Sequence, residues 1–406
     1  MNQIKVIICI LVLIFNFSGA AIASELQQPL ENEVNDFIDY DIVSSRGIVL
    51  KIVDEKVEAF EALGGSKMTT QYIKVLITNG SRKGEEVLVE NIIDETFLYN
   101  LDVSEGQEIL LDIELDPQGV IRKGYVTQIV RDKYLYYLIA FFVLVLVGIG
   151  GKKGFKTLLT LIFTIYCIFK IFLPRVLVGE NPILLSIGIA ALVTIITIFV
   201  VSGFNKKSIA AILGTIGGVL ISGCVALVMG KVGNLTGLGN DEAQMLMMIP
   251  QATNFNFEGL LFSGIILGAL GAVMDVCMSI SSSMTEIQEA GNDLSYFRLF
   301  KSAMNVGKDM MGTMSNTLIL AYTGSSMYMM LIFLAHEIPL VDILNKDYIA
   351  SEIVRALAGS IGLILAIPVT ALVFILISKK NDRNRDLKVV KAAVSKDIKE
   401  VEVDGI

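Results

Sequence analysis

The spacing of apolar residues divides the chain into two regions of different character. Between residues 46 and 131 apolar and polar residues alternate, whereas from Tyr134 onward the chain consists of long apolar runs. Alternation is typical of β-strands, and a run of about twenty apolar residues is the length that an α-helix needs to cross a bilayer. The pattern therefore predicts a small β-domain followed by a membrane-spanning helical bundle.

The alternating region predicts five short strands. They are expected at residues 46–54, 71–79, 86–91, 107–115 and 120–130, and turn residues separate them at 79–84 and 116–119. Short strands at this spacing are typical of a small barrel or sandwich, of either OB-like or SH3-like type. We therefore expect an all-β domain over residues 46–131, with residues 25–45 as the linker before it.

The apolar region predicts a transmembrane domain over residues 134–378. Seven spans are expected, at residues 134–150, 155–173, 183–201, 208–229, 259–280, 312–335 and 353–378. The charged residues 379–406 follow as a tail. The expected fold class is a membrane all-α bundle of about seven transmembrane helices, preceded by a small all-β domain.

Residues 1–24 have the pattern of a signal peptide. Lys5 precedes an apolar core from Val6 to Phe17, and Ala21 and Ala23 give the small-x-small spacing of a cleavage site. An uncleaved anchor is the alternative. Both readings place the following domain outside the cell membrane.

The loop charges predict the same orientation. Basic residues lie in the loops at 151–154 and 205–207, in the segment after the fifth span, and at 379–385. Short cytoplasmic loops carry an excess of Lys and Arg. We therefore expect a multi-pass protein of a bacterial plasma membrane, with an extracytoplasmic β-domain and a cytoplasmic C-terminus.

Composition excludes several classes of function. Only 18% of the residues are charged, which is low for a soluble protein. Residues 25–133 hold 22 acidic and 11 basic side chains, a net charge of 11 − 22 = −11, so we expect no nucleic acid as a partner. His336 is the single histidine, and the chain has no P-loop motif. We therefore expect no metal centre, no ATP hydrolysis, no cofactor and no enzymatic activity.

One acidic residue falls inside a predicted span. A stripe with helical spacing consists of Gly264, Gly268, Gly271, Asp275, Ser279, Ser282 and Glu286. Small residues let helices approach closely, and an ionised carboxylate facing lipid costs several kcal/mol. We therefore expect Asp275 to point into the bundle. There it is either a structural acid or, with Ser279 and Ser282, part of a substrate or ion pathway.

A second polar face is expected on the following span. Asn305, Asp309, Gly312 and Asn316 again have helical spacing. We predict Asp309 and Asn316 as further pathway residues, with Asn316 as a partner for Asp275; a packing amide is an equal alternative for Asn316. Helix packing is predicted for Gly264, Gly268, Gly271 and Gly312, and for Gly214 and Gly218 on an earlier span.

These two stretches resemble the YibE/F-like family of bacterial membrane proteins. The resemblance rests on residues 271–276, 279–282 with 286–287, and 307–318 with 321–322. Lys308 stands where the family often has Arg, which keeps the charge. The resemblance implies this architecture, points to Asp275, Asp309 and Asn316, and implies a permease of unassigned substrate with a homologous membrane subunit as partner.

Three functions are consistent with these features. The first is a secondary transporter or permease for a small solute or ion, in contact with the lipid bilayer. The second is a non-transport scaffold or sensor whose β-domain binds a cell-surface partner. The third is an intramembrane aspartyl protease in which Asp275 and Asp309 share a proton. We favour the first, because Asp309 is expected at the membrane edge and Asp275 lacks a Gly-x-Gly-Asp context.

Overall fold

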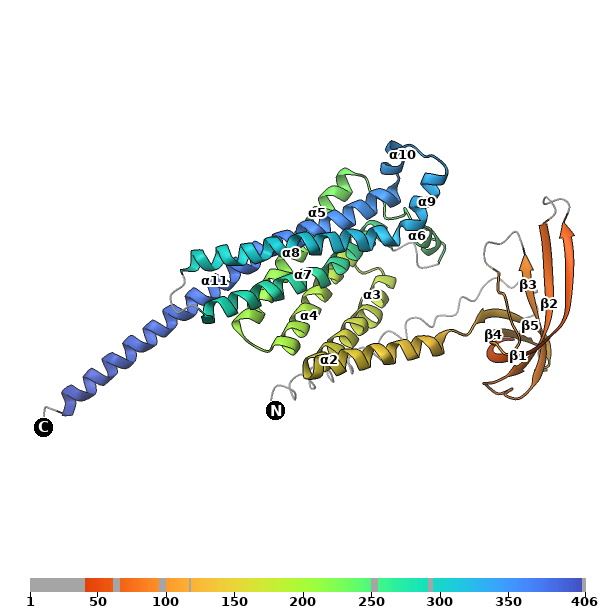
Figure 1. Ribbon diagram of the computed structural model, residues 1–406, viewed down its shortest axis with the longest axis horizontal. Helices are drawn as coiled ribbons and strands as arrows, with labels where there is room; N and C mark the ends of the chain where they lie inside the picture. The colour runs from red at the N-terminus through yellow and green to blue at the C-terminus, as the bar shows by residue number, and fades with distance from the viewer. Residues whose placement is uncertain are drawn as a thin grey trace. The chain divides into compact units, whose positions relative to one another are not determined.

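The computed structural model describes residues 41–60, 66–94, 100–116, 118–249, 255–290 and 295–403. The predicted signal peptide lies outside these ranges. The described residues belong to two compact units, a β-barrel and a helical unit, which divide near residue 145 (Figure 1).

The first unit is a closed five-stranded barrel. Its strands are β1 (Asp41–Phe60), β2 (Ser66–Ile77), β3 (Glu86–Asp94), β4 (Glu108–Leu115) and β5 (Ile121–Ile129), in the order β1–β2–β3–β5–β4. Neighbouring strands are antiparallel, except that β3 meets β5 in parallel at Glu90 and Tyr125. The predicted small β-domain is confirmed as a barrel, and this strand order is that of its OB-like form.

Alternation along the strands separates the barrel core from its surface. On β4, the side chains of Ile109, Leu111 and Ile113 are fully buried, and the residues between them are not. They pack against buried residues of β1, β2 and β3. The outer surface nevertheless carries large apolar side chains that are 39–58% exposed, at Leu50, Val53, Val57, Leu88 and Ile92.

The second unit is helical. Its elements are α2 (Asp132–Tyr166), of which the part up to Val145 groups with the barrel, the π-helix η2 (Cys167–Phe172), α3 (Leu173–Leu177), α4 (Pro182–Ser202), α5 (Lys206–Val232), α6 (Asp241–Leu246), α7 (Phe257–Ala290), α8 (Tyr296–Ser325), α9 (Met327–Ala335), α10 (Leu340–Leu344) and α11 (Asp347–Val403).

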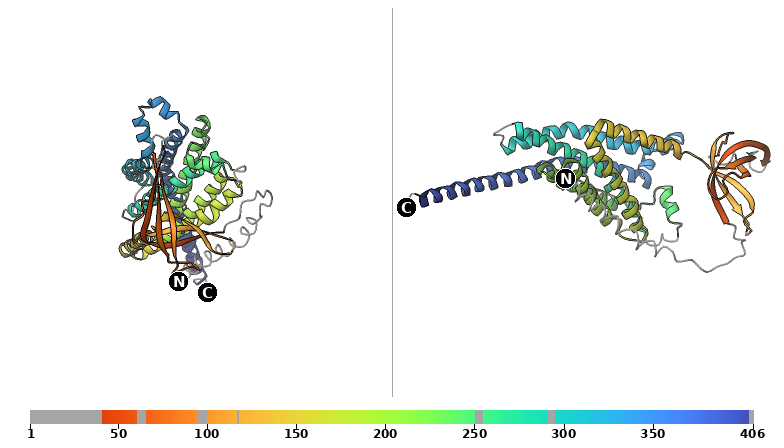
Figure 2. Two further views of the ribbon diagram at one scale, coloured as in Figure 1. Left: turned by 90° about the vertical axis from the view of Figure 1, so that its right-hand side faces the viewer. Right: turned by 90° about the horizontal axis from the view of Figure 1, so that it is seen from below.

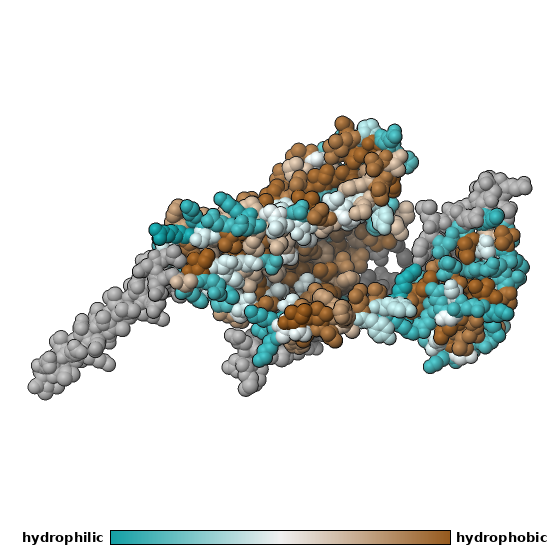
Figure 3. All heavy atoms as spheres, viewed as in Figure 1, coloured by the Kyte–Doolittle hydropathy of each residue, from teal (hydrophilic) through white to brown (hydrophobic). Residues whose placement is uncertain are grey.

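Several of these helices have the length and composition of membrane spans. Among the described residues there are five, or six if α8 and α9, which are bent by 61°, count together as one. This is compatible with a multi-pass membrane protein, but it does not establish the expected seven spans. Figure 3 shows broad apolar areas on the helical unit and a largely hydrophilic barrel.

The expected loop between the first two spans coincides with a break in α2. Gly151 has φ 53° and ψ −131°, a left-handed conformation that glycine adopts without steric cost. A Cβ atom at Gly154 would collide with the carbonyl oxygen of Leu146. The chain therefore turns sharply here, and α2 consists of two helical parts that meet at Gly151.

Beyond this break, the π-helix η2 packs against α4. Its first and last residues, Cys167 and Phe172, are both buried, and so are Phe163 and Val176 on either side. These four buried positions are spaced by four, five and four residues.

The core of the helical unit lies where α5, α7 and α11 pack together, and α4 and α8 cover it. Figure 2 shows α11, in blue, continuing past the other helices. The small residues of α5 lie at the centre of these contacts. A Cβ atom on Gly218 would lie 2.6 Å from Cβ of Ala366 and 2.8 Å from Cγ1 of Val273, and one on Gly214 would collide with Thr370. These glycines therefore permit a helix approach that alanine would block.

Gly218→Ala tests this packing. We expect it to lower the free energy of unfolding by about 1–3 kcal/mol, because the added methyl group has no space. Gly264→Ala is the control, since nothing described lies within 4 Å of its Cβ position. Thermal unfolding of the detergent-purified protein measures both. Equal midpoints for the two variants would contradict the proposed close contact.

Candidate functional site

The stripe of α7 that contains Asp275 faces away from the core. The buried stripe of this helix consists of Phe262, Ile266, Ala269, Val273, Val276, Cys277 and Ile280, and Asp275 lies on the opposite side and is exposed. The inward orientation predicted for Asp275 is therefore not found in the single chain. The reason is that α7 carries two stripes of helical period, and the apolar one packs against α5 and α11.

The predicted polar residues of α8 are also on an outer face. Asn305, Asp309, Gly312 and Asn316 are exposed, whereas Ala303, Gly307 and Leu318 are buried on the other side of the helix. No hydrogen bond or ion pair among the described residues involves Asp275 or Asp309. Ser279 and Ser282 on α7 are half-buried.

The glycines predicted to pack helices differ in their surroundings. No described atom lies within 4 Å of a Cβ position on Gly264, Gly271 or Gly312, whereas a Cβ atom on Gly268 would lie 2.7 Å from the Tyr322 hydroxyl oxygen. Gly214 and Gly218 are packed within the unit, as described above. The open glycines therefore lie on the same exposed stripes as Asp275 and Asp309.

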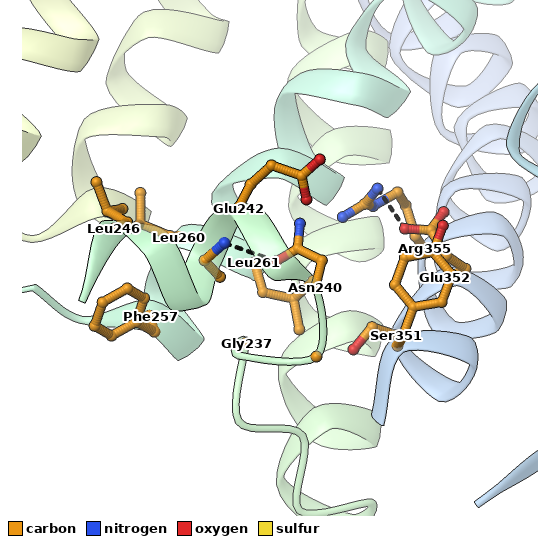
Figure 4. A pocket seen from close by; sticks show the side chains of 13 residues that line it. Gly237, Asn240, Glu242, Leu246, Phe257, Leu260, Leu261, Ser351, Glu352 and Arg355 are labelled. Carbon is orange, nitrogen blue, oxygen red and sulfur yellow. Dashed lines mark hydrogen bonds and ion pairs between the residues drawn. The ribbon is translucent and has the colours of Figure 1, made fainter. Parts of the chain in front are cut away.

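A cavity of about 280 Å³ lies at one end of the helical unit. It is lined by residues of the α5–α6 loop, α6, the start of α7 and the start of α11. Figure 4 shows Asn240 and Glu242 on one side, and Ser351, Glu352 and Arg355 on the other.

The loop is held against the helix ends by specific contacts. Thr236 donates a hydrogen bond from Oγ1 to Oδ2 of Asp347 at 2.7 Å. Gly237 has φ 75° and its Cβ position collides with the Phe257 carbonyl group, and a Cβ atom on Gly239 would lie 2.6 Å from the Tyr348 nitrogen. Glycine is therefore required at both positions for this loop to close the cavity.

An ion pair forms one wall of the cavity. The Glu352 Oε1 and Arg355 Nη1 atoms are 2.7 Å apart, and the two side chains are only 14% and 28% exposed. The Arg355 guanidinium also lies 5.9 Å from the centre of the Tyr322 ring, which is within cation–π range. Charged groups in apolar helices need such partners, and they are often functional.

Three polar atoms beside this pair have no hydrogen-bond partner among the described residues. They are the Ser351 hydroxyl oxygen, Oε2 of Glu352 and Nε of Arg355, and all three are buried. Ser351 itself is 6% exposed. Buried polar atoms without partners cost free energy. Polar groups that converge on a cavity are typical of a ligand site.

Glu352 also borders a second cavity of about 180 Å³ between α8 and α11. This cavity is mainly lined by apolar residues together with Tyr322, Thr323 and Ser326. Among the described residues, no three His, Cys, Asp or Glu side chains come together in a way that would hold a metal ion. The arrangement can therefore offer a carboxylate, a guanidinium and hydroxyl groups to a small polar molecule.

The sequence interpretation missed Glu352 and Arg355. A Glu and an Arg three residues apart at the start of a long apolar run were a usable signal, because such residues meet on one helix face. The expected span began at residue 353, which placed Glu352 in a loop. The cavity itself was not predictable, since its other wall comes from residues 237–243.

The fold and these features define a helical protein with several apolar helices and an OB-like barrel before them. A family model described as YibE/F-like protein matches residues 138–380, and one described as YibE/F family N-terminal domain matches residues 44–129. The chain therefore belongs to the YibE/F-like family. No curated protein and no solved structure matches it.

A double-mutant cycle tests the ion pair. We expect Glu352→Gln and Arg355→Gln each to lower the free energy of unfolding, because each leaves a charge without its partner. The double variant should lose less than the two losses added together, with a coupling of about 1 kcal/mol. Thermal unfolding in one detergent measures all four proteins. Additive losses would show that the two charges do not interact.

Proposed function

We propose that the chain is a permease, a secondary transporter for a small solute or ion in a bacterial plasma membrane. The observation that carries this proposal is the cavity beside Glu352 and Arg355, where three buried polar atoms lack partners. The residues that carry these atoms line the cavity, so a bound polar solute would supply the missing hydrogen bonds once the side chains turn toward it. The absence of a P-loop motif from the sequence favours a gradient as the energy source.

The proposal includes seven crossings. The segment Asp132–Leu177 has 46 residues, which in helical form would be about 69 Å long, roughly twice the hydrocarbon thickness. Two crossings that meet at Gly151 fit this length. With α4, α5, α7, the bent pair α8–α9 and α11, the total is seven. The basic loops then lie in the cytoplasm, and the barrel lies outside.

In this topology the cavity opens toward the outer side of the membrane. The loop before α11 is external, so a solute would reach Ser351 and Glu352 from outside. The carboxylates of Glu242 and Glu352 outnumber the guanidinium of Arg355. This balance favours a solute that carries a positive charge or several hydrogen-bond donors.

We assign Asp275, Asp309, Asn316, Ser279 and Ser282 to the membrane part of the pathway. Asp275 and Asp309 have no ion-pair or hydrogen-bond partner among the described residues. An acid at this depth needs water or a protein neighbour. The pathway would therefore run along the outer face of α7 and α8, with its other wall supplied from outside this chain.

A scaffold or sensor remains the second candidate, and the barrel surface favours it. Exposed apolar residues such as Val53, Val57 and Ile92 are a feature of surfaces that bind a protein partner. The two functions respond differently to Asp275→Asn. A scaffold should tolerate this substitution, whereas the permease should lose its activity.

Ser351→Ala tests the permease. We compare ions and small metabolites by mass spectrometry in a bacterial deletion strain that carries the wild type or a variant. The wild type should reverse the changes caused by the deletion, and Ser351→Ala should reverse them less than half as well, because a solute loses one hydrogen bond. Ser360→Ala is the matched control, since Ser360 is also on α11, also 6% exposed and also unpartnered.

If Ser351→Ala and Asp275→Asn both fully reverse the metabolite and ion changes caused by the deletion, at equal protein levels in the membrane, transport through these residues is contradicted. If Ser360→Ala also fails to reverse these changes, the loss seen with Ser351→Ala comes from misfolding of the protein.

Cysteine labelling tests the topology. In a variant without native cysteines, Ser81→Cys and Asp342→Cys should react with an impermeant maleimide in intact cells. Lys152→Cys should react only after the cells are permeabilised, because two crossings that meet at Gly151 place it in the cytoplasm. A single crossing by α2 would bury position 152 in hydrocarbon, and labelling would then fail under both conditions.

A further inference from the structure

The exposed face of α8 has the spacing of a helix–helix seam. Asn305, Asp309, Gly312 and Asn316 follow one another at intervals of four, three and four residues. This is the spacing of the two core positions of a heptad, with Asp309 and Asn316 at equivalent positions seven residues apart. All four residues are exposed, and the side of α8 that packs on the core lies opposite.

This seam is unsuited to lipid. Asn316 lies within the apolar part of α8, and its amide group would face hydrocarbon without a hydrogen-bond partner. Gly312 has no described atom within 4 Å of its Cβ position, so another helix can approach closely there. In Figure 3, hydrophilic and intermediate residues are mixed with apolar ones along α8.

We propose that the seam of α8 pairs with the same seam of a second copy of this chain. Two copies inserted with the same topology are related by a two-fold axis along the membrane normal, so their α8 helices run parallel at equal depth. Asn316 then faces Asn316 of the partner subunit, and an amide can both donate to and accept from its equivalent. A polar Asn at this heptad position is a known determinant of pairing between two parallel helices.

Charge complementarity supports this occupant. Lys308 directly precedes Asp309, and both side chains are exposed. In a parallel pair of helices, a residue at this core position packs beside a residue of the other helix. That residue is the one directly before the same core position. Each Asp309 therefore lies beside the partner's Lys308, and the contact occurs twice across the axis. Each Asp309 also faces its own equivalent, as Asn316 does, and the two Lys308 ammonium groups offset the repulsion between the two carboxylates. A surface that carries both charges in this order is complementary to itself.

Within the described part of the chain, the apolar half of α2 offers no such complement. The apolar half of α2 before Gly151, from Leu138 to Gly150, has no charged or amide side chain. It could cover the seam only by leaving Asp309 and Asn316 unpaired. A different membrane subunit is the other occupant, and the experiment below separates it from a second copy.

The inference rests on the membrane placement of α8 in the proposed function, but not on transport. The experiment measures only whether two copies of the chain associate. Its result therefore does not depend on any transported solute.

Reciprocal charge reversal tests the pairing. Two differently tagged copies of the full chain are co-expressed, extracted in mild detergent, and captured through one tag. Wild-type copies should capture each other. Lys308→Asp alone and Asp309→Lys alone should each reduce capture about fivefold or more, because like charges then meet twice across the axis. Membrane yield and thermal unfolding show whether each variant is folded.

The decisive sample combines the two single variants. A copy with Lys308→Asp and a copy with Asp309→Lys restore both opposite-charge contacts, so mixed capture should return to the wild-type level. A chain carrying both substitutions should also pair with itself. In a variant without native cysteines, Asn316→Cys should form a disulfide-linked dimer on mild oxidation. Leu213→Cys, which is 47% exposed on α5, is the control and should not.

Failure of the mixed sample to restore capture would overturn pairing through these charges. Equal cross-linking of Asn316→Cys and Leu213→Cys would overturn the seam. If wild-type copies do not capture each other, and a different membrane protein is captured in a manner that depends on Lys308 and Asp309, the second copy is the wrong occupant.

Discussion

A polar group in an apolar environment must find a partner within the protein, and this requirement accounts for most of the helical unit. The backbone meets it by forming helices, because each helix satisfies its own N–H and C=O groups. Side chains meet it less completely. Thr194, Thr215 and Thr370 donate to carbonyl groups one turn earlier in their own helices. Ser351, Asp275 and Asn316 have no such partner among the described residues, and Glu352 has one for only one of its two oxygens. These are the residues to which we assign function.

The glycines of the helical unit fall into two groups, according to whether another helix of the same chain packs against them. Neighbouring helices occupy the space beside the glycines of α5, since a Cβ atom on Gly218 would contact both α7 and α11. Those at Gly264, Gly271 and Gly312 face open space. One class of glycine therefore packs the helices of the single chain, and the other lies on the exposed faces to which we assign the pathway and the pairing.

Much of the fold could be predicted from the sequence, because strand alternation and apolar run length depend on nearby residues. Five strands were found near the expected positions, although β1 is longer at both ends and β2 begins and ends earlier than expected. The direction of Asp275 could not be predicted, since both stripes of α7 have helical period and only their packing decides which one turns inward. The bend between α8 and α9 was missed because the apolar run continues through it. The cavity was missed because Glu352 and Glu242 are far apart in the chain.

The π-helix η2 shows a different limit of periodicity. One additional residue in a turn rotates everything after it by about 100° relative to a regular helix. The buried positions Phe163, Cys167, Phe172 and Val176 stay in line only because the turn between the middle two is wider. The wider turn therefore keeps the buried positions before and after it on one side of the chain, while η2 itself packs against α4. A single-residue insertion in a membrane helix can in this way be absorbed locally, without disturbing the contacts on either side.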